Sequence, residues 1–325
     1  MTDSPVLLEA KDVTKSFGKV RALAGTSLRL RAGELVGLVG ADGAGKTTLV
    51  RALVGLVDID GGTVLVNGET WKEAGSSARE TLGYMPQQYS LYPDLSVDEN
   101  LTFFATLFGL KRDVFQERRA KLLGMAQLEG ARDRPAGALS GGMYKKLAVA
   151  CALLHQPRAL VLDEPTNGVD PVSRRELWAL LYEFVAGGMG VLLATPYMDE
   201  AARCGRVVLL SHGQVIAEGA PSALVASLGH PVIQLDVPSH DRSRIVSALE
   251  DHRGVLAVTP AGQHLRAVLR REYEGEVRNM LSGIRVRDVR PDFEDVYLAL
   301  VDRPKEERPL HSRDQTSSAT GAGRA

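Results

Sequence analysis

Short, continuously apolar runs recur along the first two thirds of the chain, and segments with apolar residues at helical spacing separate them. Three of these runs are Leu35–Val39, Leu160–Leu162 and Val191–Ala194. Strands that are apolar on both faces are typical of a parallel sheet that helices cover on both sides. The pattern therefore predicts an α/β fold around a buried, parallel core sheet.

The spacing of apolar residues becomes helical between residues 88 and 157. The stretches "LTFFATLFGL" and "QERRAKLLGMAQL" repeat their apolar positions with the period of a helix and have little β character. They predict a helical subdomain inserted into the first domain. Further along, residues 206–221 contain a strand, a Gly-bearing turn and a second strand, which predicts a hairpin. We expect this hairpin to close a domain that spans residues 1–225.

The pattern restarts at His230, where strand-like and helical segments follow one another in βαββαβ order. This order predicts a small α+β accessory domain over residues 230–302. From Arg303 to the end the chain is polar, contains Pro, Ser and Gly, and is nearly free of large apolar residues. Such a segment buries too little apolar surface to order itself, so residues 303–325 are predicted to form a disordered tail.

Composition narrows the classes of function. The formal net charge is -1, so the chain has no overall basic field, and we expect no nucleic-acid partner. The two cysteines, Cys151 and Cys204, are too few for a disulfide framework and indicate a reducing compartment. No window approaches eighteen apolar residues and the N-terminus has no leader pattern, so we do not expect the chain itself to span a membrane.

The clearest chemical motif is "GADGAGKTT", which fits the pattern G-x-x-x-x-G-K-[ST] between an apolar strand and a helix. In this P-loop, glycines let backbone N–H groups surround a phosphate, Lys46 reaches the β- and γ-phosphate oxygens, and Thr47 ligates Mg²⁺. A Gly-rich turn without a ligand is the alternative. The motif predicts an ATP site made of Gly40, Ala41, Asp42, Gly43, Ala44, Gly45, Lys46, Thr47 and Thr48.

A second apolar strand, in "RALVLDEPT", delivers Asp163 and Glu164 at its carboxyl end. Asp163 is suited to hold Mg²⁺, and Glu164 to orient or deprotonate an attacking water. Carboxylates at strand ends are more often simply solvated. Their catalytic interpretation therefore depends on Lys46 and Thr47.

The sequence "LSGGM" lies between these two motifs, and with it the chain resembles the ATPase subunits of ABC (ATP-binding cassette) transporters over about residues 6–220. The resemblance implies a P-loop NTPase fold with an antiparallel β part at the N-terminal edge. It also implies that Phe17 stacks on adenine, that Gln87 contacts Mg²⁺ and takes part in catalysis with Glu164 and Lys46, and that Asp170 is the D-loop residue. The implied signature motif, which contacts ATP held by a second subunit, is Leu139, Ser140, Gly141, Gly142 and Met143.

Residues 140–178 look most like the multidrug-export branch, whose membrane partners are ABC-2-type permeases. This resemblance implies a peripheral subunit on the cytoplasmic face of the membrane. It would bind MgATP at a dimer interface and drive separate permease subunits that dock on its helical subdomain. Two alternatives remain, a soluble ABC ATPase that serves translation or DNA repair, and a regulatory subunit that binds ATP without useful hydrolysis.

One position departs sharply from the family pattern. In "GVLLATPYMDEAARC" a proline, Pro196, stands where ABC ATPases have a histidine that contacts the γ-phosphate. Proline has neither a side-chain donor nor a backbone N–H. We do not expect His155 or His212 to reach the phosphate in its place, while hydroxyls at Thr195 and Tyr197 remain a weaker alternative.

We therefore hypothesise that this chain binds MgATP but hydrolyses it slowly at its own site. Its second ATPase subunit is then either another copy, in a homodimer, or a histidine-bearing partner in a heterodimer. Two milder departures are Met143, where many signatures have glutamine, and Asp42, where the P-loop usually has asparagine.

Overall fold

The computed structural model describes residues 4–88 and 91–301. The chain divides into two compact units, with the division between Ser227 and Leu228. Among the described residues, no helix is long and apolar enough to cross a membrane. The segment 303–325, for which the sequence predicts a disordered tail, lies outside the described residues.

A six-stranded sheet forms the centre of the first unit, in the order β10-β9-β3-β8-β7-β6. The neighbours from β9 to β6 run parallel, and only β10 pairs antiparallel, with β9. The three apolar runs of the sequence form β3, β7 and β8, and every residue of these strands is buried. The predicted parallel core sheet is therefore confirmed. Its strands are β3 (Leu35–Val39), β6 (Leu82–Met85), β7 (Ala159–Asp163), β8 (Gly190–Thr195), β9 (Arg206–Ser211) and β10 (Gln214–Gly219).

The strand order decides which chemical groups meet. β8 lies between β3 and β7, so the strand before the P-loop and the strand that ends at Asp163 are not neighbours. All three strands point the same way, and their carboxyl ends share one edge of the sheet. Pro196 follows β8 directly, which puts the position that lacks a histidine between the two halves of the predicted ATP site.

A second, antiparallel sheet belongs to the N-terminal part of the same unit, with the order β2-β1-β4-β5. Leu8 and Leu30 from this sheet share one buried cluster with Leu38 and Leu192 from the parallel sheet. The antiparallel part that the resemblance implied is present. Its strands are β1 (Val6–Phe17), β2 (Val20–Arg31), β4 (Gly61–Val66) and β5 (Glu69–Thr70).

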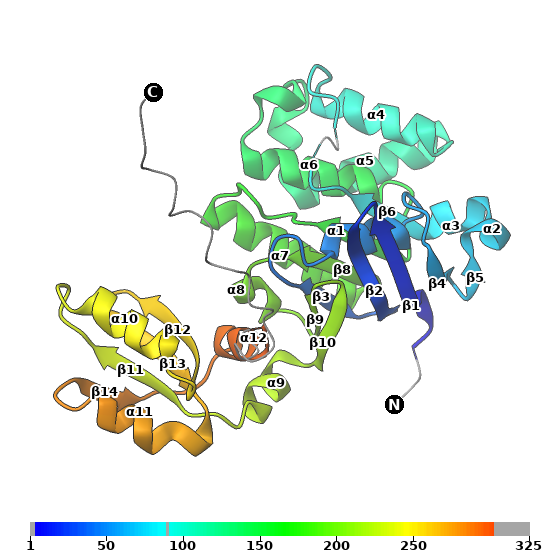
Figure 1. Ribbon diagram of the computed structural model, residues 1–325. Coiled ribbons are helices and arrows are strands. Elements are labelled where there is room, and N and C mark those ends of the chain that lie inside the picture. The colour runs from blue at the N-terminus through cyan, green and yellow to red at the C-terminus, as the bar shows by residue number, and fades with distance from the viewer. Residues whose placement is uncertain (1–3, 89–90, 302–325) are drawn as a thin grey trace, which may run out of the picture. The chain divides into compact units, whose positions relative to one another are not determined.

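Helices connect these strands, and three of them, α4 to α6, form an insertion between β6 and β7 (Figure 1). Ser96 caps the first of the three in a capping box with Glu99. The helices of this unit are α1 (Lys46–Leu53), α2 (Trp71–Ala74), α3 (Ser76–Thr81), α4 (Val97–Leu107), α5 (Arg112–Ala126), α6 (Gly141–Leu153), α7 (Pro171–Ala186), α8 (Met198–Ala201) and α9 (Pro221–Ser227).

The second unit is a four-stranded antiparallel sheet with the order β12-β13-β11-β14. Helices α10 and α11 complete the predicted βαββαβ order, and their residues Leu249 and Val277 share a buried core with Ile233 of β11. The sequence did not predict the following helix, α12, which the pair Arg266–Asp295 ties to β13. The elements are β11 (Val232–Asp236), α10 (Arg242–Asp251), β12 (Val255–Ala261), β13 (His264–Leu269), α11 (Glu274–Met280), β14 (Arg285–Asp288) and α12 (Phe293–Val301).

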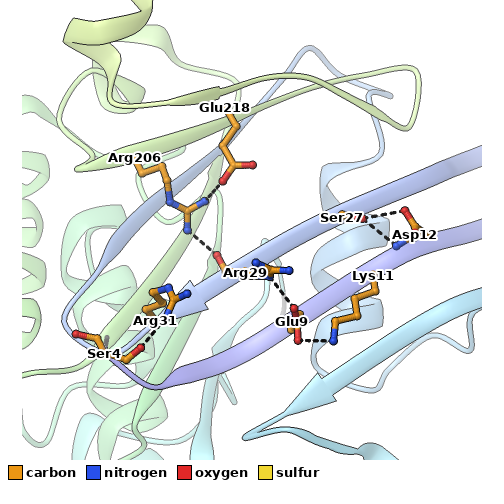
Figure 2. Close-up of polar contacts among 9 residues, drawn as sticks. All are labelled: Ser4, Glu9, Lys11, Asp12, Ser27, Arg29, Arg31, Arg206 and Glu218. Atoms are coloured by element: carbon orange, nitrogen blue, oxygen red, sulfur yellow. Dashed lines mark hydrogen bonds and ion pairs between the residues drawn. The ribbon is translucent and has the colours of Figure 1, made fainter. Parts of the chain in front are cut away.

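One arginine fastens the edge of the antiparallel sheet to the parallel sheet. The guanidinium of Arg206, on β9, donates to the backbone carbonyl of Arg29 and pairs with Glu218, as Figure 2 shows. It also makes a bidentate pair with Glu34. A planar guanidinium with several fixed partners holds its neighbours better than a single surface ion pair does.

We predict that Arg206→Ala lowers the free energy of unfolding by about 2 kcal/mol, because hydrogen bonds to charged groups are lost and their partners stay half-buried. The matched control is Arg29→Ala, whose exposed side chain pairs, among the residues that the structure describes, with Glu9 alone (Figure 2), and we expect a change below about 0.5 kcal/mol. Thermal unfolding of the purified full chain measures both effects. Equal shifts for the two variants would contradict the role given to Arg206.

Candidate functional site

The loop between β3 and α1 has the form that a phosphate cradle requires. Gly45 adopts φ +106°, and a Cβ at this position would lie 2.5 Å from the backbone oxygen of Ala22, so only glycine fits. Lys46 is 5% exposed, and its Nζ donates to the carbonyl oxygens of Gly40 and Ala41 at 2.8 and 3.0 Å. The first N–H groups of α1 have no partner within the helix, which makes the helix start suitable for an anion.

Three carboxylates act on the ammonium group of Lys46. Burial lowers the pKa of Lys46, while the carboxylates of Glu164, Asp42 and Asp163 act in the opposite direction. The nearest atom of Asp42, Oδ1, lies 3.9 Å from Nζ. The side chain of Asp42 is otherwise 95% exposed and carries its negative charge on the loop that surrounds the predicted phosphates.

We predict that Asp42→Asn raises the affinity for ATP by about threefold, because an exposed carboxylate close to the phosphates repels them only weakly through water. Titration with a fluorescent ATP analogue at low salt measures the effect, and added salt should shrink it. Asp58→Asn removes an exposed carboxylate elsewhere on the same unit and serves as the control. Equal affinities of wild type and Asp42→Asn at low salt would contradict the prediction.

Asp163 contacts Thr47 of the P-loop, although 116 positions of sequence separate the two residues. Its Oδ1 accepts a hydrogen bond from the Thr47 hydroxyl at 3.3 Å. The residue is fully buried, and its Oδ2 has no hydrogen-bond partner among the described residues. Burial raises the pKa of this carboxyl. A buried, unpartnered carboxylate oxygen beside a threonine hydroxyl is a donor set that suits Mg²⁺.

Glu164 is held in an unusual backbone conformation at the end of β7. Its φ is +49°, and its N–H donates to the carbonyl of Ala194 at 2.9 Å. Gln87 Nε2 donates to Glu164 Oε2 at 2.8 Å, and Asn167 Nδ2 donates to the same oxygen at 3.2 Å. The sequence did not single out Asn167. Its position three residues after Glu164 is a signal, because one turn of the backbone can place its side chain next to that carboxylate.

Five side chains therefore meet at one edge of the parallel sheet: Lys46, Thr47, Gln87, Asp163 and Glu164.

Phe17 lies at the end of β1 with 52% of its surface exposed, and Lys15 Nζ is 5.4 Å from its ring centre. An exposed aromatic ring is able to stack on a base, as the resemblance implied. Its role as an adenine platform stays a prediction.

The signature residues form a separate group with Asp170. Ser140 is the N-cap of α6, and its hydroxyl accepts from the N–H of Met143 at 3.3 Å. A Cβ on Gly142 would lie 2.3 Å from Ser173, so this position needs glycine for close approach to the start of α7. Asp170 caps α7 through the N–H groups of Val172 and Ser173. Within residues 4–88 and 91–301, no hydrogen bond joins residues 139–143 or Asp170 to the P-loop.

The neighbours of Pro196 offer little to replace a histidine. The Thr195 hydroxyl donates to Glu200 at 2.7 Å, and its oxygen accepts from the N–H of Tyr197 at 3.1 Å. Tyr197 is 37% exposed, and the guanidinium of Arg174 lies 5.7 Å from its ring centre. Thr195 is thus engaged within the protein, which weakens one of the alternatives that the sequence left open.

The two histidines of this unit are also accounted for. The helix α6 ends at Leu153, and His155 lies in the turn that follows. Its ring stacks on Phe108 at 3.9 Å between centres and contacts the carbonyl of Leu82. His212 lies exposed in the turn between β9 and β10. Cys151 and Cys204 are free and buried, and burial raises the pKa of both thiols, which makes them unreactive.

Comparisons with known proteins agree with this geometry. The sequence model of a family described as "ABC transporter" matches residues 23–167. The "Probable multidrug ABC transporter ATP-binding protein YbhF" of Escherichia coli is 36% identical over 283 residues, 86% of this chain and 49% of that protein. The "Nod factor export ATP-binding protein I" of Burkholderia lata is 37% identical over 304 residues, 91% of this chain and 97% of that protein. The chain thus spans about half the length of the first relative and nearly all of the second.

Two solved structures share this fold over about two thirds of the chain. One, "Structure of ATP binding subunit of ABC transporter", has a TM-score of 0.63 and 31% identity, and covers 69% of this chain and 93% of its own. Another, a dimeric bacterial ABC transporter cassette, has a TM-score of 0.60 and 25% identity, and covers 66% of this chain and 98% of its own.

Proposed function

This chain belongs to the family of ABC transporter ATP-binding proteins, and we propose from that premise that it is the motor subunit of an ABC-2-type export complex. In this proposal it binds MgATP, dimerises with a second ATPase subunit and drives separate permease subunits from the cytoplasmic face of the membrane. Two relatives, a probable multidrug transporter subunit and a Nod factor export subunit, support export.

The observation that carries the proposal is the meeting of five side chains at one sheet edge. The hydrogen bond from Thr47 to Asp163 joins the phosphate loop to the end of β7. The hydrogen bond from Gln87 to Glu164 joins the loop after β6 to the residue that directly follows Asp163. Hydrolysis of ATP needs a phosphate cradle, a place for a cation and a base within reach of one another, and these two contacts connect all three.

In the proposed mechanism each group has one task. Lys46 and the N–H groups at the start of α1 hold the phosphates, and Thr47 and Asp163 provide oxygens for the cation, with Gln87 beside them. Bound Mg²⁺ would neutralise charge on the phosphate oxygens as the bond to the leaving group breaks. Glu164 orients and deprotonates the attacking water, and the hydrogen bonds from Gln87 and Asn167 fix its carboxylate.

The proposed dimer uses the group around Ser140. The start of α6 exposes N–H groups that suit an anion, and its glycines lie against Gly168 and Ser173 near Asp170. In this family that helix start faces ATP held by the other subunit. A solved structure of a similar bacterial cassette is dimeric, which supports dimerisation. Because Pro196 offers no donor, we propose slow hydrolysis at this chain's own P-loop, and a partner subunit whose site is completed by Ser140, Gly141 and Gly142.

A groove on the first unit fits the proposed permease contact. It has a volume of about 400 Å³ and lies between the edge of the parallel sheet and the inserted helices. Apolar and aromatic side chains line it, and Leu56 on its rim is 63% exposed. Groups of exposed apolar side chains at a concave surface are typical of protein contacts. The principal lining residues are Trp71, Tyr84, Phe104, Phe108, Cys151 and His155.

Affinity purification of the tagged full chain from detergent-solubilised membranes tests the proposal. Integral membrane polypeptides should co-purify with it, and Leu56→Arg should reduce their amount about fivefold, because a charge would enter an apolar contact. Met280→Arg changes another exposed apolar residue, 41% exposed and on the other unit, and serves as the control. Recovery with ribosomes or DNA-repair proteins would favour the soluble class. A membrane complex that binds ATP without Lys46-dependent turnover would favour the regulatory alternative.

A further inference from the structure

A fully buried carboxylate lies behind the position that lacks a histidine. Glu200 belongs to α8 and has no exposed surface. Its Oε1 accepts a hydrogen bond from the Thr166 hydroxyl, and its Oε2 accepts one from the Thr195 hydroxyl at 2.7 Å. Both threonines are buried as well. A charge this deep persists only where surrounding donors compensate for lost water, and these two hydroxyls are its hydrogen-bond donors.

The two hydroxyls come from different parts of the site. Thr166 stands two residues after Glu164, and Thr195 ends β8 directly before Pro196. The carboxylate of Glu200 therefore bridges the segment that carries Glu164 to the strand end beside it. On the far side of Thr195, the N–H of Tyr197 closes a turn onto the same hydroxyl oxygen. With φ fixed by Pro196 inside that turn, the strand end is a rigid support.

The hydrogen bonds of Glu200 help to hold the backbone conformation of Glu164. A glutamate at φ +49° is in a sparsely populated conformation that its surroundings must impose. One constraint is the bond from its own N–H to the carbonyl of Ala194. The second is the tether from Thr166 to Glu200. Both end on the stretch Ala194–Glu200, so the position of Glu164 depends on that stretch staying in place.

A purely structural ion pair explains this carboxylate less well. The only cation paired with Glu200 among the described residues is Arg174, whose Nε is 3.8 Å from Oε1 and has no hydrogen-bond partner. Arg174 also lies 3.6 Å from Asp199 and near the ring of Tyr197. The short contacts of Glu200 are instead the two that join the segments on either side of the site. The hydrogen bonds of Glu200 therefore indicate that it positions the two segments that carry Thr166 and Thr195.

We propose that Glu200 is a positioning residue for hydrolysis, which holds Glu164 in its active conformation by tethering Thr166 to Thr195. The inference rests on the proposed function, because it assigns Glu200 a task only if Glu164 acts on water at this site. Glu200 itself touches neither phosphate nor water in this role. Loss of the tether should therefore slow the chemical step and leave nucleotide binding, which belongs to Lys46 and Thr47, nearly unchanged.

The experiment uses substitutions that keep the shape of the buried cluster. In Thr166→Val and Glu200→Gln one tether is lost or weakened, since valine has no hydroxyl and an amide offers only one acceptor. We expect the single-turnover rate of ATP hydrolysis by the full chain to fall about five- to tenfold in each, less than the hundredfold that an ångström of misplacement can cost. The dissociation constant of a fluorescent ATP analogue should stay within about twofold. Thr166→Ser keeps the hydroxyl and should keep the wild-type rate.

The controls separate three outcomes. Asp199→Asn changes the neighbouring, exposed carboxylate and should leave the rate unchanged. Because Thr166 and Thr195 act through one carboxylate, the loss in Thr166→Val/Thr195→Val should be smaller than the product of the single losses. Rates within twofold of wild type in Thr166→Val and Glu200→Gln, or a parallel loss of rate and ATP binding, would overturn the inference alone. Wild-type turnover that survives Lys46→Ala would overturn the proposed function and this inference together.

Discussion

Replacement of Glu164 by glutamine is expected to abolish most of the ATP hydrolysis that this chain's own site performs, while the chain still binds ATP. A positioned general base contributes about a hundred- to ten-thousandfold to a rate, and an amide cannot accept the proton of the attacking water. The substitution preserves volume, and the amide oxygen still accepts the hydrogen bond that Gln87 donates to this position. The loss should therefore fall on the chemical step.

Two measurements separate the chemical step from binding. Single-turnover hydrolysis reports the rate, and a fluorescent ATP analogue reports the affinity, which should stay within about threefold of wild type because the phosphate cradle is intact. A subunit that binds ATP and cannot cleave it should also accumulate as an ATP-bound dimer on size exclusion. Glu183→Gln removes an exposed carboxylate of α7 and serves as the control. Wild-type turnover in Glu164→Gln would assign the base to another residue.

The fold was largely predictable because its strongest signals are local. Runs that are apolar on both faces identified β3, β7 and β8, and the βαββαβ succession identified the second unit. Strand order is not a local property, and the insertion of β8 between β3 and β7 was not foreseen. The helix α12 was not predicted, although the helical spacing of its apolar residues buries Phe293, Val296 and Tyr297.

In the candidate site, too, some residues were predictable from the sequence and others are brought together only by the fold. Lys46, Thr47, Asp163 and Glu164 were predictable because parallel strands bring loops at their carboxyl ends to one edge of a sheet. The contact between Thr166 and Glu200 spans 34 positions and is set by the packing of α8 against the strand ends. Neither residue belongs to a phosphate-binding pattern. A buried tether of this kind has no signature in spacing, so only the fold reveals it.

Replacement of Pro196 by histidine is expected to increase the rate of ATP hydrolysis. Pro196→His should raise single-turnover hydrolysis at this chain's own site by about ten- to a hundredfold, because removal of one well-placed donor to developing charge typically costs a hundred- to a thousandfold. The position follows β8, between the strand that precedes the P-loop and the strand that ends at Asp163, so a side chain there starts next to both halves of the site. ATP affinity should rise by less than the rate, since the donor acts mainly on charge that develops during bond breaking.

The decisive control is Pro196→Ala, which restores a backbone N–H and frees φ without adding a side-chain donor. If the missing imidazole limits the rate, alanine should leave hydrolysis within about twofold of wild type, while histidine raises it. If alanine and histidine raise it equally, the limit lies in the rigid turn that Thr195 and Tyr197 form around the proline. If neither substitution changes the rate and Lys46→Ala still abolishes it, the site already has its full complement of donors, and slow hydrolysis at this chain's own P-loop would be refuted.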